Sequence, residues 1–109
     1  MIYEVEVSEQ ADPDLREIFE YIDFELQSPE NAIGQLNRLE EQILSLDAMP
    51  KRYRKYEKEP WKSRELHILP VDNYVILYIP NSDKKIVTIL RVMYAGRDID
   101  NQLNFHTKQ

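Results

Sequence analysis

The amino-acid sequence predicts an α+β domain with the order β-α-α-β-β-β, in which an N-terminal helical hairpin packs on a mainly antiparallel sheet. Three observations support this class. Apolar residues recur at helical spacing in the first half, three runs rich in Val, Ile, Leu and Tyr follow in the second half, and a short alternating segment precedes both. The 109 residues fit one domain, 1–109, with the hairpin at about 12–49 and the strand meander at about 64–95.

The first strand and the first helix follow from local patterns. Ile2 to Val7 alternates apolar and polar residues with one slip, which favours a strand. Asp12 and Pro13 supply a helix N-cap followed by proline at the first helical position. The apolar stripe behind them indicates an amphipathic helix and consists of Leu15, Ile18, Phe19, Ile22 and Leu26.

The second helix repeats the same kind of start. Ser28 and Pro29 form its cap and first turn, and Pro50 marks its end. The short connection between the helices predicts an antiparallel hairpin whose stripes face the core and whose acidic backs face water. The second stripe comprises Ala32, Ile33, Leu36, Leu39, Ile43, Leu46 and Met49.

Three strands follow in the second half. Glu65 to Leu69 and Tyr74 to Ile79 are each ended by a proline, Pro70 and Pro80. Ile86 to Tyr94 is nearly all apolar, which predicts a central strand with both faces covered. Short turns between consecutive strands imply an antiparallel meander.

The charge of the chain is unevenly distributed. The formal net charge is −6, but residues 8–50 carry eleven acids against two bases, whereas residues 51–64 carry seven bases against two acids. An acidic protein lacks the long-range positive field that a general nucleic-acid binder needs. The basic segment can still dock an anion at short range, and its alternative interpretation is a solvated loop.

Composition excludes several kinds of site. The chain has no cysteine, which rules out disulfides, thiolate zinc sites and cysteine nucleophiles, and its two histidines disfavour a histidine-rich metal site. No apolar run reaches the roughly 18 residues that a transmembrane helix needs, and the N-terminus does not have the pattern of a secretory signal. We therefore expect a cytoplasmic protein without membrane contact.

Several strings, in this order, resemble the RelE/ParE superfamily of bacterial toxins. They are residues 5–8, 28–32, 64–66 and 73–78, and the last strand running into Gly96-Arg97-Asp98, which is the most specific element. The similarity covers roughly residues 2–103. The long helical hairpin is more similar to the ParE-like and plasmid-stabilization branch than to the compact ribosome-dependent nucleases.

The resemblance implies the toxin component of a type II toxin–antitoxin system, neutralised by a cognate antitoxin protein and using neither metal nor cofactor. ParE-like members inhibit DNA gyrase without nuclease chemistry. RelE-like members are metal-independent endoribonucleases that cut messenger RNA on the ribosome. A third interpretation is a degenerate toxin that only binds its antitoxin. Whether this chain is an enzyme stays open at this stage.

The same resemblance suggests residues for each alternative. RelE-like members carry basic residues on the first meander strand, an arginine just after the tyrosine of the next strand, and another arginine after the last strand. Here Arg64 and His67 fall near the first of these positions and Arg97 matches the last, which gives the minimal set for a nuclease. Val75 replaces the middle arginine. This substitution and the acidic balance favour ParE-like inhibition of gyrase.

Other residues have structural interpretations. Arg91 lies inside an apolar strand and predicts a salt bridge with an acid on the helices. Tyr74 and Tyr78 share a strand face and favour packing. His67 alternates with apolar neighbours, which predicts a position on the polar face of its strand.

Binding to the antitoxin or the target involves a second set. The basic segment offers a surface complementary to an acidic partner. Gly96 allows a tight exit from the last strand, and Arg97 follows on an exposed end where its planar fork can reach an anion. Asp98 either caps the following backbone or orients Arg97. The predicted binding residues are Arg52, Arg54, Lys55, Tyr94 and Arg97.

Overall fold

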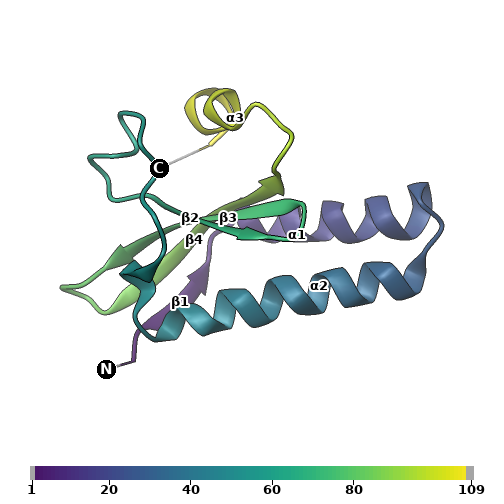
Figure 1. Cartoon of the computed structure of the whole chain (residues 1–109), viewed down its shortest axis with the longest axis horizontal. Coiled ribbons are helices and arrows are strands. Elements are labelled where there is room, and N and C mark those ends of the chain that lie inside the picture. Colours follow the sequence, from purple (N-terminus) through teal and green to yellow (C-terminus); the bar gives the residue numbers. More distant parts are fainter. Residues whose placement is uncertain (1, 108–109) are drawn as a thin grey trace.

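The computed structural model describes residues 2–107 and has the predicted α+β architecture (Figure 1). Residues 1, 108 and 109 of the predicted domain lie outside this described part. The four strands have the order β1-β4-β3-β2, with β1 parallel to β4 and the other neighbours antiparallel, so the mainly antiparallel sheet is confirmed. The elements are β1 (Glu4–Val7), α1 (Ala11–Glu20), α2 (Pro29–Leu44), β2 (His67–Val71), β3 (Tyr74–Asn81), β4 (Ile86–Tyr94) and α3 (Ile99–Phe105).

Both faces of the sheet are buried. The hairpin of α1 and α2 covers one face, where Ile18, Leu39 and Ile43 meet Ile76 and Ile89. The other face is covered by α3 and by the loop that precedes β2 (Figure 1). β4 lies between β1 and β3 and is buried over most of its length, which explains its nearly continuous apolar run. The apolar cluster on the second face consists of Trp61, Leu66, Ile68, Val75, Leu77, Leu90, Met93 and Leu103.

The C-terminal helix α3 was not predicted, and the element order is β-α-α-β-β-β-α. Asp98 caps it, because the Asp98 carboxylate accepts a hydrogen bond from the Asn101 backbone N–H at 3.1 Å. Seven residues are too few for an independent helix, so α3 depends on tertiary contacts. Leu103 is fully buried, and the Trp61 indole N–H donates to Asn104 Oδ1 at 2.9 Å.

The two ends of α1 differ from the prediction. The helix begins at Ala11, and the Ser8 hydroxyl, not Asp12, accepts from the Ala11 N–H at 3.1 Å while donating to the Leu90 carbonyl at 2.9 Å. At the other end Tyr21–Glu25 forms a π-helical turn. The extra residue per turn shifts the apolar stripe, so Leu26 is 56% exposed and not in the core.

Helix α2 begins at Pro29 as predicted but ends at Leu44. Short 3₁₀ turns follow it, and Met49, which adopts a left-handed conformation with φ of 48°, is exposed. Ile33 is also exposed, because the buried stripe of α2 runs through Ala32 and Leu39. No helix within residues 2–107 combines the length and apolar character needed to cross a membrane.

Two strands continue through the prolines that were expected to end them. β2 includes Pro70 and lies at an edge of the sheet, where a missing N–H is tolerated. β3 includes Pro80, which lies beyond the last β2 partner of this strand, the His67–Tyr78 pair. Pro80 therefore leaves no hydrogen bond to β2 unmade, and each predicted strand end was two residues short.

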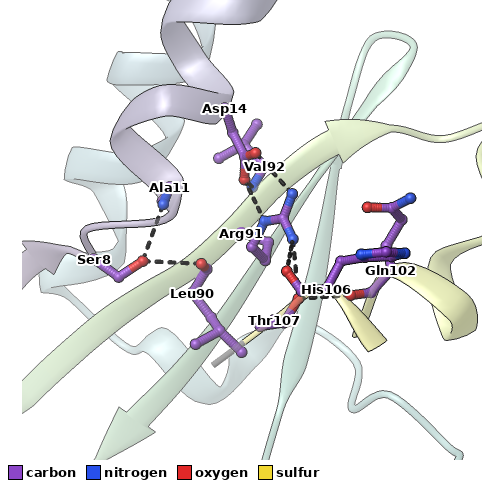
Figure 2. A network of polar contacts seen from close by, with 9 residues as sticks. All are labelled: Ser8, Ala11, Asp14, Leu90, Arg91, Val92, Gln102, His106 and Thr107. Atoms are coloured by element: carbon purple, nitrogen blue, oxygen red, sulfur yellow. Dashed lines mark hydrogen bonds and ion pairs between the residues drawn. The ribbon is translucent and has the colours of Figure 1, made fainter. Parts of the chain in front are cut away.

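A buried ion pair joins α1 to β4 (Figure 2). Asp14 accepts hydrogen bonds from Arg91 Nε at 2.6 Å, Arg91 Nη2 at 2.8 Å and the Val92 N–H at 3.0 Å. Arg91 Nη1 also donates to the His106 carbonyl and to the Thr107 hydroxyl, both at 3.0 Å. The Asp14 carboxylate raises the pKa of Arg91. The predicted salt bridge is confirmed, but Asp14 does not lie on the outward acidic face.

We predict that breaking this pair strongly lowers the free energy of unfolding. Asp14→Leu or Arg91→Met alone leaves one buried charge without its partner, at a cost of about 3 to 5 kcal/mol. The double variant removes both charges and should lose less than either single variant. Urea unfolding followed by circular dichroism measures all three. Arg16→Met, which breaks the exposed Arg16–Asp12 pair, is the control and should cost about 0.5 kcal/mol or less. A loss for Arg91→Met no larger than this control would contradict the prediction.

Candidate functional site

Arg97 lies on the turn that leaves β4 and is exposed, as predicted. The Arg97 N–H donates to the Tyr94 carbonyl at 3.1 Å, and the Ala95 N–H donates to the Asn73 carbonyl at 2.8 Å. Gly96 does not use a positive φ here. A Cβ at this position would lie 2.4 Å from the Tyr94 ring, so a larger residue here would displace that ring from the backbone. The turn thus fixes both Tyr94 and Arg97 at the end of the sheet.

A groove of about 630 Å³, the α1 groove, is lined by residues of α1 and of the sheet. Tyr94 is 53% exposed and packs edge-on against Tyr74, with ring centroids 6.0 Å apart. These rings give the groove an aromatic side, and Glu17 and Arg97 add opposite charges. The lining residues are Asp14, Glu17, Ile18, Tyr21, Leu26, Asn73, Tyr74, Val92, Met93, Tyr94 and Arg97.

A second hollow of about 390 Å³, the basic cleft, lies between the 54–58 segment and the turn at 97–100, with Ile68 also in its lining. Asp100 accepts hydrogen bonds from the Tyr56 hydroxyl and from Lys58, which joins the two sides. Arg97 lines both hollows. The cleft therefore brings part of the predicted basic surface next to the predicted arginine after β4.

The three predicted binding residues of the basic segment have different environments. Arg52 covers the C-terminal end of α2, where its guanidinium donates to the Ala48 and Met49 carbonyls. Lys55 Nζ lies 2.6 Å from Glu65 Oε2, and this contact lowers the pKa of Glu65. Arg54 is exposed and makes no ion pair within the described chain. Arg54 and Lys55 line the basic cleft, and of these two only Arg54 forms no ion pair within residues 2–107.

The expectation that His67 lies on an exposed polar face is wrong. His67 is 2% exposed, its Nδ1 lies 2.8 Å from the Glu65 carbonyl oxygen, and its ring is 5.4 Å from that of Tyr78. Lys55 pairs with His67 as an isolated bridge, so a further segment covers the outer edge of β2. His67 is therefore inaccessible to solvent although it lies on an edge strand of the sheet.

Arg64 is also separated from Arg97. It precedes β2, is half-buried, and its guanidinium carbon lies 5.0 Å from the centre of the Trp61 ring. Neither Arg64 nor His67 lines the α1 groove or the basic cleft. The structure thus does not bring the three proposed nuclease residues into one hollow.

The tyrosines of β3 pack as predicted. Tyr78 is fully buried and its hydroxyl donates to the Pro50 carbonyl at 2.6 Å; burial raises its pKa. Tyr74 is half-buried against the helical face. Val75 points to the opposite face and is 4% exposed within the Trp61 cluster.

Sequence reasoning missed the helical side of the α1 groove. Asp14 was counted among the outward acids, although Ala11, Asp14 and Ile18 recur at spacings of three and four and are all buried. That spacing was the available signal. The ion pair between Lys58 and Asp100 could not be predicted from the sequence. Neither residue falls in a segment with helical or strand periodicity, so no spacing pattern relates the two.

The fold and the sequence are both similar to known toxins. Solved structures with the same fold include the chromosomal ParDE toxin–antitoxin system of P. aeruginosa, with a TM-score of 0.71, 18% identity, and coverage of 85% of this chain and 96% of that one. The RelBE toxin–antitoxin complex of Mycobacterium tuberculosis has a TM-score of 0.64, 21% identity, and coverage of 86% and 99%. A mutant of E. coli toxin RelE in the free state has a TM-score of 0.64, 15% identity, and coverage of 91% and 90%.

At these identities the likeness to solved structures establishes the fold alone. No curated protein sequence matches the chain significantly. The family described as the ParE toxin of the type II toxin–antitoxin system parDE matches residues 5–99. Because this match spans most of the sequence, the chain belongs to the ParE toxin family of type II toxin–antitoxin systems.

Proposed function

We propose that this chain inhibits bacterial growth in the cytoplasm by ParE-like inhibition of DNA gyrase, without nuclease chemistry, until a cognate antitoxin neutralises it. The observation that carries the proposal is the closed second face of the sheet. Trp61 and Leu103 cover the face that Val75, Leu77 and Leu90 present. RelE-like nucleases carry an arginine at the position of Val75, and here that position is buried among apolar side chains.

The chemistry of RNA cleavage needs more than this surface offers. Metal-free cleavage requires a base for the 2′-hydroxyl, cations for the developing phosphorane charge, and an acid for the leaving oxygen. His67 is buried on the helical side beside Tyr78, and Arg64 lies over Trp61. Of these three residues Arg97 is exposed and Arg64 is half-buried, and an arginine can bind an anion but cannot serve as a base near neutral pH. These contacts favour a binding role over catalysis.

The α1 groove supports an antitoxin as the partner. Tyr21, Leu26 and Tyr94 are each more than half exposed although they are large and apolar or aromatic. Exposed apolar surface beside a helix is typical of a groove that receives an apolar helix or an extended segment. The similar structures from P. aeruginosa and M. tuberculosis are described as toxin–antitoxin systems. A segment that fills the α1 groove also covers Arg97, so antitoxin and target would compete for it.

We predict that expression of the chain alone slows growth and that the product of an adjacent short reading frame restores it. Purified chain should inhibit gyrase supercoiling and should leave messenger RNA on ribosomes intact, because the face used for cleavage is closed. The two assays are run with the same preparation. Cleavage of messenger RNA without any effect on gyrase would reverse the assignment, and normal growth with verified folded protein would support the degenerate toxin.

We predict that Arg97→Ala weakens toxicity and leaves the fold intact. An exposed arginine at an interface contributes about 1 to 2 kcal/mol, so the concentration needed for half inhibition of gyrase should rise roughly 5- to 30-fold. The melting temperature should stay within about 1 °C because Arg97 makes no ion pair within residues 2–107. Arg16→Ala, another exposed arginine, is the matched control and should retain full activity. Undiminished toxicity of the folded Arg97 variant would remove Arg97 from the target-binding surface.

A further inference from the structure

The turn between β2 and β3 contacts the turn that carries Arg97. The Ala95 N–H donates to the Asn73 carbonyl at 2.8 Å. Tyr74, the residue after Asn73, is paired in register with Tyr94, and the two rings pack edge-on with centroids 6.0 Å apart. Asn73 also lines the α1 groove together with Arg97. The position of the Arg97 turn therefore depends on the position of the β2–β3 turn.

The β2–β3 turn is short and has a constrained backbone. Asp72 and Asn73 connect Val71 to Tyr74, which are paired across the two strands. Asp72 adopts a left-handed conformation with φ of 55°, which a short polar side chain tolerates better than most others. A connection of two residues has few backbone conformations available. A contact that fixes Asp72 therefore also fixes the neighbouring Asn73 carbonyl.

Two side chains of α2 hold Asp72. Asp72 Oδ2 accepts hydrogen bonds from Arg38 Nε at 2.7 Å and from Gln35 Nε2 at 3.0 Å. Gln35 is buried, so this donor comes from the packed face of α2. The hydrogen bonds from Arg38 and then from Gln35 lower the pKa of Asp72, so the carboxylate is ionised near neutral pH. The second helix thus holds the β2–β3 turn through one carboxylate.

We propose that Arg38, acting through Asp72, is a positioning residue for Arg97. The contacts run from Arg38 to Asp72, along the turn to the Asn73 carbonyl, and from this carbonyl to the Ala95 N–H. The role rests on the proposed function, in which Arg97 binds the target. Arg38 itself lines neither the α1 groove nor the basic cleft, so it acts by holding the turn and not by contact with the target.

The exposure of the pair favours a local role over a global one. The side chains of Arg38 and Asp72 are 54% and 43% exposed, and exposed ion pairs contribute little to the free energy of unfolding. Binding through the planar Arg97 guanidinium depends on its direction, and a fixed support reduces the entropy that is lost on binding. Loss of the pair should therefore loosen the Arg97 turn without unfolding β4.

Amide hydrogen exchange of the full chain, followed by NMR, tests the positioning directly. In Arg38→Met the Ala95 N–H should exchange about three- to fivefold faster, as expected for the loss of one exposed ion pair. The Val92 N–H, which donates to the buried Asp14, is the internal reference and should change less than about twofold. Arg16→Met breaks another exposed ion pair and is the matched control, which should leave exchange at Ala95 unchanged.

Gyrase inhibition tests the functional consequence. The concentration of Arg38→Met needed for half inhibition should rise about three- to fivefold, while its melting temperature stays within about 3 °C of the parent value. Asp72→Asn tolerates the left-handed backbone but lacks the charge, and should act in the same direction. Adding Arg38→Met to Arg97→Ala should weaken inhibition by less than the product of the two single effects, because no guanidinium is left to position.

Three results are decisive. Unchanged exchange of the Ala95 N–H in Arg38→Met, or an equal change at Ala95 and Val92, would overturn the proposal. Single effects of the Arg38 and Arg97 variants that multiply in full would also overturn it, because Arg38 would then act independently of Arg97. A parent chain without effect on gyrase would refute the proposed function, and the exchange measurement, which needs no target, would still decide the positioning.

Discussion

The ion pair between Asp14 and Arg91 is the contact on which the rest of the structure depends. Burying two charges is costly unless their hydrogen-bonding groups are satisfied, and here the carboxylate receives three hydrogen bonds. The remaining Nη1 of Arg91 holds the chain beyond α3 through the His106 carbonyl and Thr107 (Figure 2). One arginine thus joins the first helix, the central strand and the C-terminal segment. Asp14 also lines the α1 groove, and the residues that Arg91 holds directly follow α3, whose Leu103 covers the second face.

The closed second face of the sheet is the feature on which the proposed binding role rests. A nuclease needs an open, polar surface on which several titratable groups meet. Here Trp61, Leu103 and their apolar neighbours fill that surface, and α3 lies over it. The exposed functional features lie instead at the end of the sheet, where Tyr94 and Arg97 border the α1 groove. The molecule therefore presents a surface suited to binding another protein.

Local patterns were enough to predict much of the fold. The α+β class, the hairpin, the three-strand meander and the salt bridge of Arg91 all followed from periodicity, turn residues and the cost of an unpaired buried charge. Arg97 was placed at an exposed strand end because Gly96 precedes it. These features depend on neighbours within a few residues or on one strong constraint, and such constraints are visible in a sequence.

The remaining features depend on contacts between distant segments. α3 is seven residues long and is held by Leu103 and by the hydrogen bond between Trp61 and Asn104, which no local pattern reports. His67 is buried because the segment around Lys55 pairs with the outer edge of β2. Pro70 and Pro80 remain within strands because each lies where no partner on one side needs its missing N–H. Those positions depend on the order of the strands in the sheet. Arg52 donates to the Met49 carbonyl and Lys55 pairs with Glu65, and these contacts form only in the folded chain.

The closed second face can be measured directly through Trp61, the single tryptophan of the chain, which is 2% exposed. The account predicts a blue-shifted emission maximum and slow quenching by acrylamide in the free, folded protein, because the indole, which extends from the loop before β2, packs on the sheet and against α3. Emission at the wavelength of a solvent-exposed tryptophan, with unhindered quenching and intact circular dichroism, would show an open face. That result would contradict the closed second face, which is the premise of the argument against nuclease chemistry.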